Sequence, residues 1–124
     1  MTVANLADAP VFANGDTTTR SLAVPSRGSS ELAVWAFDMN PGASGPEHTV
    51  DREEVFVVTS GRVVAVLGGV EHVAGEGDAL IVSPNTPFAL RNASQTERAT
   101  GTVCASAGIT ASLGGKTILP PWAQ

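Results

Sequence analysis

Two side chains that can transfer protons or bind a metal lie six residues apart near the middle of the chain, His48 and Glu54. A Pro41-Gly42 pair precedes them and predicts a turn, and the apolar run 55–58 that follows predicts a strand. A short bend between the two residues can bring the imidazole and the carboxylate to a common point. We therefore treat His48 and Glu54 as a candidate catalytic pair for general acid–base chemistry.

Short apolar or β-branched runs recur along the chain between Gly- and Pro-containing turns, which predicts an all-β fold. The expected strands are residues 10–12, 20–24, 31–39, 55–58, 62–67, 70–74, 79–82, 88–92 and 98–105. Trp35, Phe37 and Met39 share one face of the third strand, and we place that face inward because burying aromatic rings gains the most free energy. We expect the apolar segment 118–122 to pack across the outside of the fold.

The chain is long enough for one domain with a hydrophobic core, because it has 124 residues of which 43% are hydrophobic and 15% are charged. We expect a single domain over residues 1–124. Residues 1–9 are small and weakly patterned, which predicts a flexible lead or a strand exchanged with a partner subunit.

The segment from Gly42 to Gly61 resembles the first motif of the cupins. In that motif a glycine is followed by two histidines with one residue between them, then by a glutamate and a closing glycine. His48 and Glu54 fall on the positions of the first histidine and the glutamate. Val50 stands where the second histidine is expected.

The second cupin motif is expected about one hairpin later, and the segment from Gly77 to Asn92 matches it. Phe88 occupies its histidine position. The two motifs span residues 42–92 and form the core of the resemblance. They imply a single cupin barrel, which is a double-stranded β-helix of the jelly-roll type.

The resemblance also implies a metal site, because cupins hold Fe, Mn, Ni, Zn or Cu with three histidines and a glutamate. Here the ligand set is degenerate, since only His48 and Glu54 keep donor atoms. Two protein ligands leave most of the coordination sphere to water, so we expect no resident metal and at most weak divalent-metal binding. Burial beside Phe56 and Phe88 is expected to raise the pKa of Glu54 unless the carboxyl is paired.

We expect the inside of the barrel to form a mostly apolar ligand pocket. Its expected lining is His48, Val50, Glu54, Phe56, Phe88, Phe37, Met39 and Leu90. The first hypothesis is a small-molecule-binding protein anchored by His48 and Glu54. The second is a metal-independent or weakly metal-dependent isomerase or cyclase that uses the same pair. A metal-dependent dioxygenase is the third hypothesis, and the incomplete ligand set favours it least. A simpler alternative is that the two residues form a hydrogen-bonded pair and the aromatic residues only fill the barrel.

Charge and composition limit the class of partner. The net charge is −5 and Lys116 is the only lysine, which argues against binding to nucleic acid or an anionic membrane surface. The chain begins without the pattern of a signal peptide and has one cysteine, so we expect a cytoplasmic protein. Val55, Val57 and Val63 are expected on the outer face, which predicts a homodimer that covers them.

Overall fold

The computed structural model describes all 124 residues and consists of short strands with three single-turn 3-10 helices. The strands are β1 (Val11–Asn14), β2 (Thr17–Ala23), β3 (Leu32–Met39), β4 (Thr49–Val50), β5 (Glu54–Ser60), β6 (Val63–Leu67), β7 (Val70–Ala74), β8 (Ala79–Val82), β9 (Phe88–Asn92), β10 (Ala99–Ser106), β11 (Ala111–Leu113) and β12 (Lys116–Ile118). The 3-10 helices are η1 (Leu6–Asp8), η2 (Pro25–Arg27) and η3 (Pro121–Ala123). None of these helices has the length and apolar character needed to cross a lipid bilayer.

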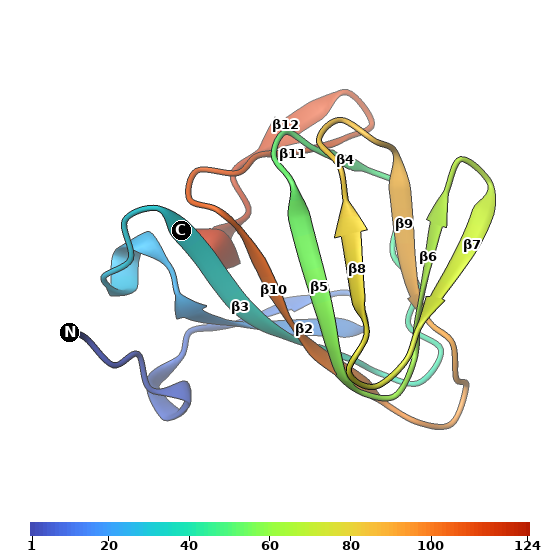
Figure 1. The fold of residues 1–124 in the computed structure, drawn as a ribbon, viewed down its shortest axis with the longest axis horizontal. Coiled ribbons are helices and arrows are strands. Elements are labelled where there is room, and N and C mark those ends of the chain that lie inside the picture. Colours follow the sequence, from blue (N-terminus) through green and yellow to red (C-terminus); the bar gives the residue numbers. More distant parts are fainter.

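The strands form one large and two small antiparallel sheets (Figure 1). The large sheet has the order β1-β2-β3-β10-β5-β8, and the small sheets have the orders β12-β11-β4 and β7-β6-β9. Two isolated β-bridges, from Ser44 to Arg91 and from His48 to Phe88, attach the segment before β4 to the outer edge of β9. The expected all-β jelly roll is therefore confirmed, although its sheets do not close into one continuous barrel.

Nine strands were expected from the sequence, and each has a counterpart in the structure. Three further strands, β4, β11 and β12, carried no clear apolar pattern. They have two or three residues each and pair with one another near one end of the fold. Strands of this length are fixed by tertiary contacts rather than by their own periodicity.

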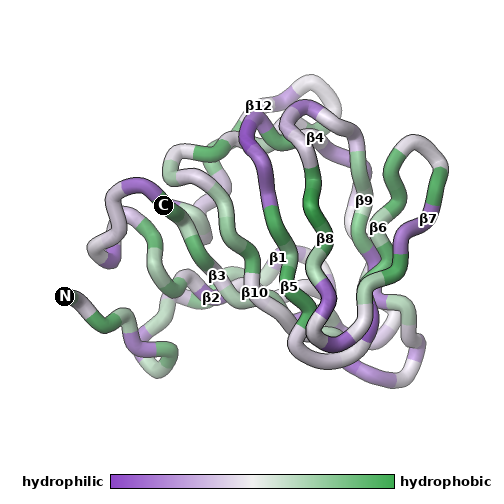
Figure 2. Tube along the Cα trace, in the orientation of Figure 1, coloured by the Kyte–Doolittle hydropathy of each residue, from purple (hydrophilic) through white to green (hydrophobic).

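Alternation along the strands of the large sheet builds the core. In β3 the side chains of Ala33, Trp35, Phe37 and Met39 are buried, which confirms the inward face expected from the sequence. Strand β10 alternates in the same way. Figure 2 shows the hydrophilic segment before β5 giving way to the hydrophobic residues of that strand. One expectation was wrong, because Val63 is fully buried and does not lie on the outer face.

The C-terminal segment also differs from the expectation. Residues 118–122 were expected on the outside of the fold, and Ile118 and Leu119 are indeed about half exposed, but Ile118 and Trp122 also line a cavity. The hydroxyl of Ser21 donates a hydrogen bond of 2.8 Å to the carbonyl oxygen of Trp122. Ala123 is fully buried. These contacts turn the end of the chain inward along β2 and β3.

Candidate functional site

A cavity of about 380 Å³ lies between the large sheet and the strands that face it. Its apolar wall consists of Trp35, Phe37, Met39, Phe56, Leu90, Val103, Ala111, Leu113, Ile118 and Trp122. Its polar side chains are Asn14, Asp16, Thr17, Thr19, Ser44, His48, Glu54 and Lys116. Sites for small organic molecules have this character, with a mostly apolar wall and a few polar groups that fix orientation.

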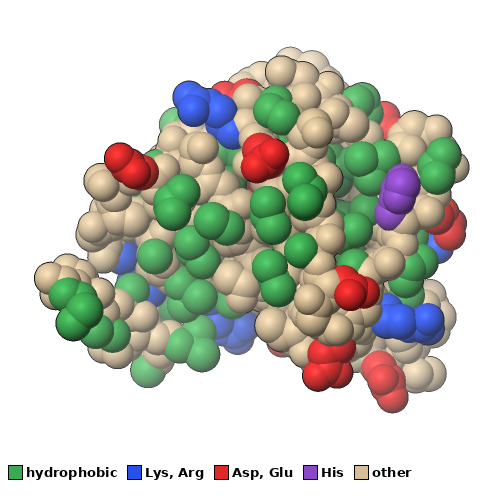
Figure 3. All heavy atoms as spheres, viewed as in Figure 1, with side chains coloured by type: hydrophobic (Ala, Val, Ile, Leu, Met, Phe, Trp, Pro, Cys, Tyr) green, Lys and Arg blue, Asp and Glu red, His purple; other side chains and the backbone are tan.

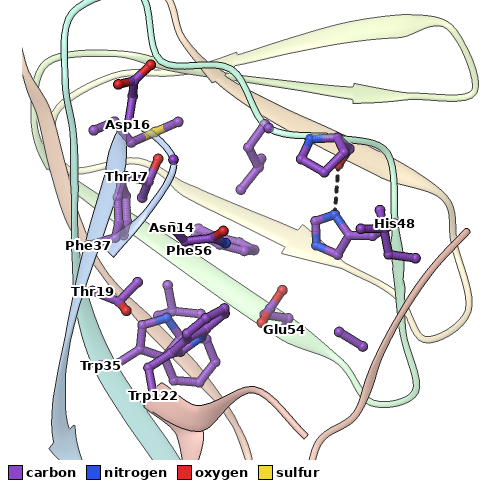
Figure 4. A pocket seen from close by; sticks show the side chains of 18 of the residues that line it. Asn14, Asp16, Thr17, Thr19, Trp35, Phe37, His48, Glu54, Phe56 and Trp122 are labelled. Atoms are coloured by element: carbon purple, nitrogen blue, oxygen red, sulfur yellow. Dashed lines mark hydrogen bonds between the residues drawn. The ribbon is translucent and has the colours of Figure 1, made fainter. Parts of the chain in front are cut away.

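His48 reaches the cavity from the segment that precedes β4. Its backbone N–H donates to the carbonyl oxygen of Phe88, and the N–H of Phe88 donates back, each at 3.0 Å. The ring Nδ1–H donates a hydrogen bond of 3.0 Å to the carbonyl oxygen of Pro46, drawn as a dashed line in Figure 4. A carbonyl oxygen can only accept, so Nδ1 carries a proton, and in the neutral form of the ring the lone pair is on Nε2. That nitrogen faces the cavity.

Glu54 reaches the cavity from the first position of β5. Its strand register pairs it with Val82 of the edge strand β8 on one side and with Ala105 of β10 on the other. The residue is 5% exposed, and burial raises the pKa of its carboxyl to about 7. No neighbouring charge offsets this burial. The carboxyl therefore carries a proton for much of the time at neutral pH, as expected for an unpaired glutamate beside Phe56.

His48 and Glu54 come from different elements and both point into the cavity (Figure 4). They do not form the hydrogen-bonded pair that the sequence left as an alternative, because the only hydrogen bond of the imidazole goes to Pro46. Nε2 of His48 and the carboxyl group of Glu54 are therefore both free to form hydrogen bonds with a molecule bound in the cavity. A lone pair and an exchangeable proton in the same cavity are the elements of general acid–base catalysis.

The other residues expected in the pocket divide into two groups. Phe37, Met39, Phe56 and Leu90 line the cavity together with His48 and Glu54. Val50 and Phe88 are 3% and 0% exposed and lie in the core beside the cavity rather than in its wall. The ring of Phe88 contacts the ring of Phe56 edge-on, with centroids 6.2 Å apart.

Several lining residues carried no signal in the sequence. Asn14, Asp16 and Thr17 belong to the hairpin between β1 and β2, and Thr19 follows in β2. Residues 111–122 supply a further part of the wall through β11, β12 and η3. The two prolines at the start of η3 did indicate a stiff segment, but the direction in which Trp122 points depends on its docking against β2.

The metal site implied by the resemblance does not fit these residues. Val50 and Phe88 have no donor atom, and both are packed in the core. No three side chains of His, Cys, Asp or Glu lie close enough together to hold a metal ion. The donor set is therefore limited to one imidazole nitrogen and one carboxyl group, which is fewer than the three or four protein ligands of tightly bound transition metals.

Comparisons with known proteins agree with this fold. Residues 35–103, more than half of the chain, match the sequence profile of the family described as Cupin domain. No curated protein sequence matches the chain. Many solved structures do, including the polyketide cyclase RemF from Streptomyces resistomycificus, with a TM-score of 0.76 and 20% identity over 98% of this chain and 82% of that one.

Two further structures resemble the chain at a similar level. A sugar phosphate isomerase of the cupin superfamily from Silicibacter pomeroyi has a TM-score of 0.69 and 20% identity over 91% of this chain and 82% of its own. The Streptomyces protein PAC13, solved with uridine, has a TM-score of 0.69 and 17% identity over 84% of this chain and 80% of its own. These likenesses establish the fold, and the profile match establishes the family: the chain belongs to the cupin domain family.

Proposed function

We propose that this cupin binds a small, largely apolar carbonyl compound in its cavity and isomerises or cyclises it, with His48 taking a proton from the compound and Glu54 giving one to it. The observation that carries the proposal is the convergence of the two groups on one mostly apolar cavity. Neither neutralises the other, and each has a free polar face toward the ligand. The surrounding apolar wall would strengthen their electrostatic effect on a bound molecule.

The proposed step is an enolisation. Nε2 of His48 takes a proton from the carbon next to the carbonyl group, and the electron pair of that C–H bond becomes a C=C bond. The carbonyl oxygen takes the proton of Glu54 as its π electrons move onto it. Returning a proton to a different carbon completes an isomerisation, whereas attack of the enol carbon on a second carbonyl of the same molecule closes a ring. No further reactant is required in either case.

The pKa of about 7 for Glu54 supports the acid role, because it provides both the acid and its conjugate base near neutral pH. Two of the structural neighbours are named for a cyclisation and an isomerisation, which belong to the same reaction class. Likeness at this level of identity concerns the fold, so the proposal depends on the side chains of this chain.

The test is proton exchange on a simple enolisable ketone. Deuterium incorporation next to the carbonyl of 2-tetralone would be followed by NMR in D2O, with buffer alone as the baseline. The wild-type protein should accelerate exchange, and Glu54→Gln and His48→Gln should each reduce the acceleration by about 100-fold or more. Exposed Glu53→Gln is the matched control and should leave it unchanged.

Binding can be measured separately in the same protein. The chain has two tryptophans and no tyrosine, and both Trp35 and Trp122 line the cavity. Intrinsic fluorescence therefore reports directly on its occupancy. Binding of the ketone without any exchange above buffer would indicate a binding protein and would contradict the enolisation step.

A further inference from the structure

The two ends of the cavity differ in chemistry. His48 lies on one side of the cavity, Trp35, Trp122 and Thr19 gather on the other, and Glu54 lies between them (Figure 4). Both tryptophans of the chain therefore line the side of the cavity opposite His48, with the carboxyl of Glu54 between them and the imidazole. A molecule that reached both ends would have its reacting carbon near one and its body against indole rings at the other.

Trp122 is held in this position by its backbone. Its carbonyl oxygen accepts the hydrogen bond from Ser21, and the carbonyl oxygen of Gln124 accepts one of 2.9 Å from the N–H of Ser26. Ala123 is fully buried between them, and a proline precedes Trp122. The end of the chain is thus fixed on both sides of the indole, which gives the cavity a wall of defined position.

Trp35 reaches the same end from β3 and is only 4% exposed. Its neighbour on the same face is Phe37, whose ring meets that of Phe56 edge-on at 6.3 Å between centroids. Aromatic walls of this kind add a geometric preference to simple apolar burial, because ring faces and edges attract other π systems in offset or edge-to-face arrangements. A saturated ring of equal size would gain only the burial.

We propose that Trp35 and Trp122 form a recognition site for a planar conjugated ring, so that the substrate is an aromatic or polyunsaturated ketone whose reacting carbon extends toward His48 and Glu54. This inference rests on the proposed function and specifies its substrate class. Trp122 is a binding residue that determines specificity and takes no part in proton transfer.

The test compares two ketones with the same carbon skeleton. In 2-tetralone one ring is aromatic, and in 2-decalone both rings are saturated. Titration calorimetry with the wild-type protein should show about tenfold tighter binding of 2-tetralone than of 2-decalone, which is the discrimination that an aromatic pair can supply. Trp122→Leu should remove the preference by weakening the binding of 2-tetralone alone, and Trp122→Phe should retain most of it.

The control is Leu119→Ala, because Leu119 lies in the same segment but is 54% exposed and does not line the cavity. It should change the binding of neither ketone. Equal wild-type affinity for the two ketones, or an equal loss of affinity for both ketones in Trp122→Leu, would overturn the planar-ring inference. The deuterium-exchange experiment tests the roles of His48 and Glu54 independently of that result. Absence of binding by either ketone would overturn both proposals.

Discussion

The imidazole ring of His48 packs against the phenyl ring of Phe88, with centroids 4.3 Å apart and planes inclined by 48°. Two backbone hydrogen bonds join the same residues, so their relative position is fixed. Phe88 stands at the position where the cupin pattern has a metal-binding histidine. Here the phenyl ring packs against one side of the imidazole, and the hydrogen bond from Nδ1 to the carbonyl oxygen of Pro46 fixes the orientation of the imidazole ring. Phe88 thus offers no donor atom at this position and holds the imidazole in place by packing.

Glu54 should make the stability of the protein fall as pH rises toward neutrality. Burial raises its pKa from 4.5 to about 7, so the folded state holds a proton in this range that the unfolded state has released. The stability contributed by the proton is complete below pH 4.5 and is lost as pH rises through 7. The loss is about 3 kcal/mol over this window. Denaturant unfolding of wild-type protein and Glu54→Gln across this range should show the slope in the wild type alone.

The matched control is Glu53→Gln, in which an exposed neighbour loses the same ionisable group. This variant should keep the pH dependence of the wild type. If Glu54→Gln retained that dependence as well, the carboxyl would be solvated or paired in the folded protein, and its proposed role as an acid near neutral pH would lose its basis.

Gly101 lies in β10 directly beside the ring of Phe37, which forms part of the cavity wall. A Cβ at this position would meet the ring of Phe37 and the carbonyl oxygen of Val57. Gly101→Ala should therefore destabilise the fold by about 1–3 kcal/mol and displace the Phe37 ring, lowering the affinity for 2-tetralone. Gly75→Ala is the control, because its nearest contact would be an ordinary 3.7 Å. Equal stability of the two variants would mean that Phe37 can move without cost.

Much of the fold could be predicted from the sequence because its strands are long enough to show alternation. The face of β3 that carries Trp35 and Phe37 was predicted correctly, since aromatic burial decides the orientation of such a strand. Val63 was assigned to the wrong face. In β6 three successive residues are buried, so parity alone could not show which side faces the core.

The outer face of the large sheet should form a homodimer interface. Strand register places Val34, Cys104, Val55 and Ile81 in one row across β3, β10, β5 and β8. Figure 3 shows hydrophobic side chains gathered on this face. Ile81 is 66% exposed, and apolar residues in a continuous patch of this kind commonly lie in contacts between subunits. Light scattering at micromolar concentration should give about twice the 12.6 kDa of the single chain.

A charge in this patch should separate the subunits. Ile81→Glu should reduce the measured mass to that of one chain without unfolding it, because the side chain is largely exposed within a subunit. Val73→Glu serves as the control, since Val73 in β7 is 57% exposed but belongs to a different sheet. A wild-type mass near 12.6 kDa would contradict the interface.

The candidate site was less predictable than the fold. His48 and Glu54 could be singled out because few residue types transfer protons and their spacing matches a known motif. Trp122 could not, because its place depends on the hydrogen bond between its carbonyl oxygen and Ser21, a residue 101 positions away in the sequence. Contacts of this range leave no periodic signal in the segment that makes them.

Restoring the lost ligands tests whether the four cupin positions still converge in this chain. Val50 and Phe88 occupy the two missing histidine positions, and Phe88 already contacts the ring of His48. The double variant Val50→His, Phe88→His should therefore recreate a set of three histidines and one glutamate. Without metal it should be less stable than the wild type by about 1–3 kcal/mol, because a fully buried phenyl ring is replaced by a smaller polar one.

Added Ni²⁺ or Zn²⁺ should more than reverse this loss in the double variant, because four good ligands bind a divalent ion far more tightly than two and a ligand of the folded state stabilises it. The measurement is the melting temperature with and without metal. Each single variant should gain less, and His48→Ala in the double variant should remove most of the gain. Val50 lies in the core beside the cavity rather than in its wall, so its substitution is the more demanding of the two. A melting temperature that did not respond to metal would show that the backbone around Val50 has moved away from the convergence point, and the site would then have to be understood from His48 and Glu54 alone.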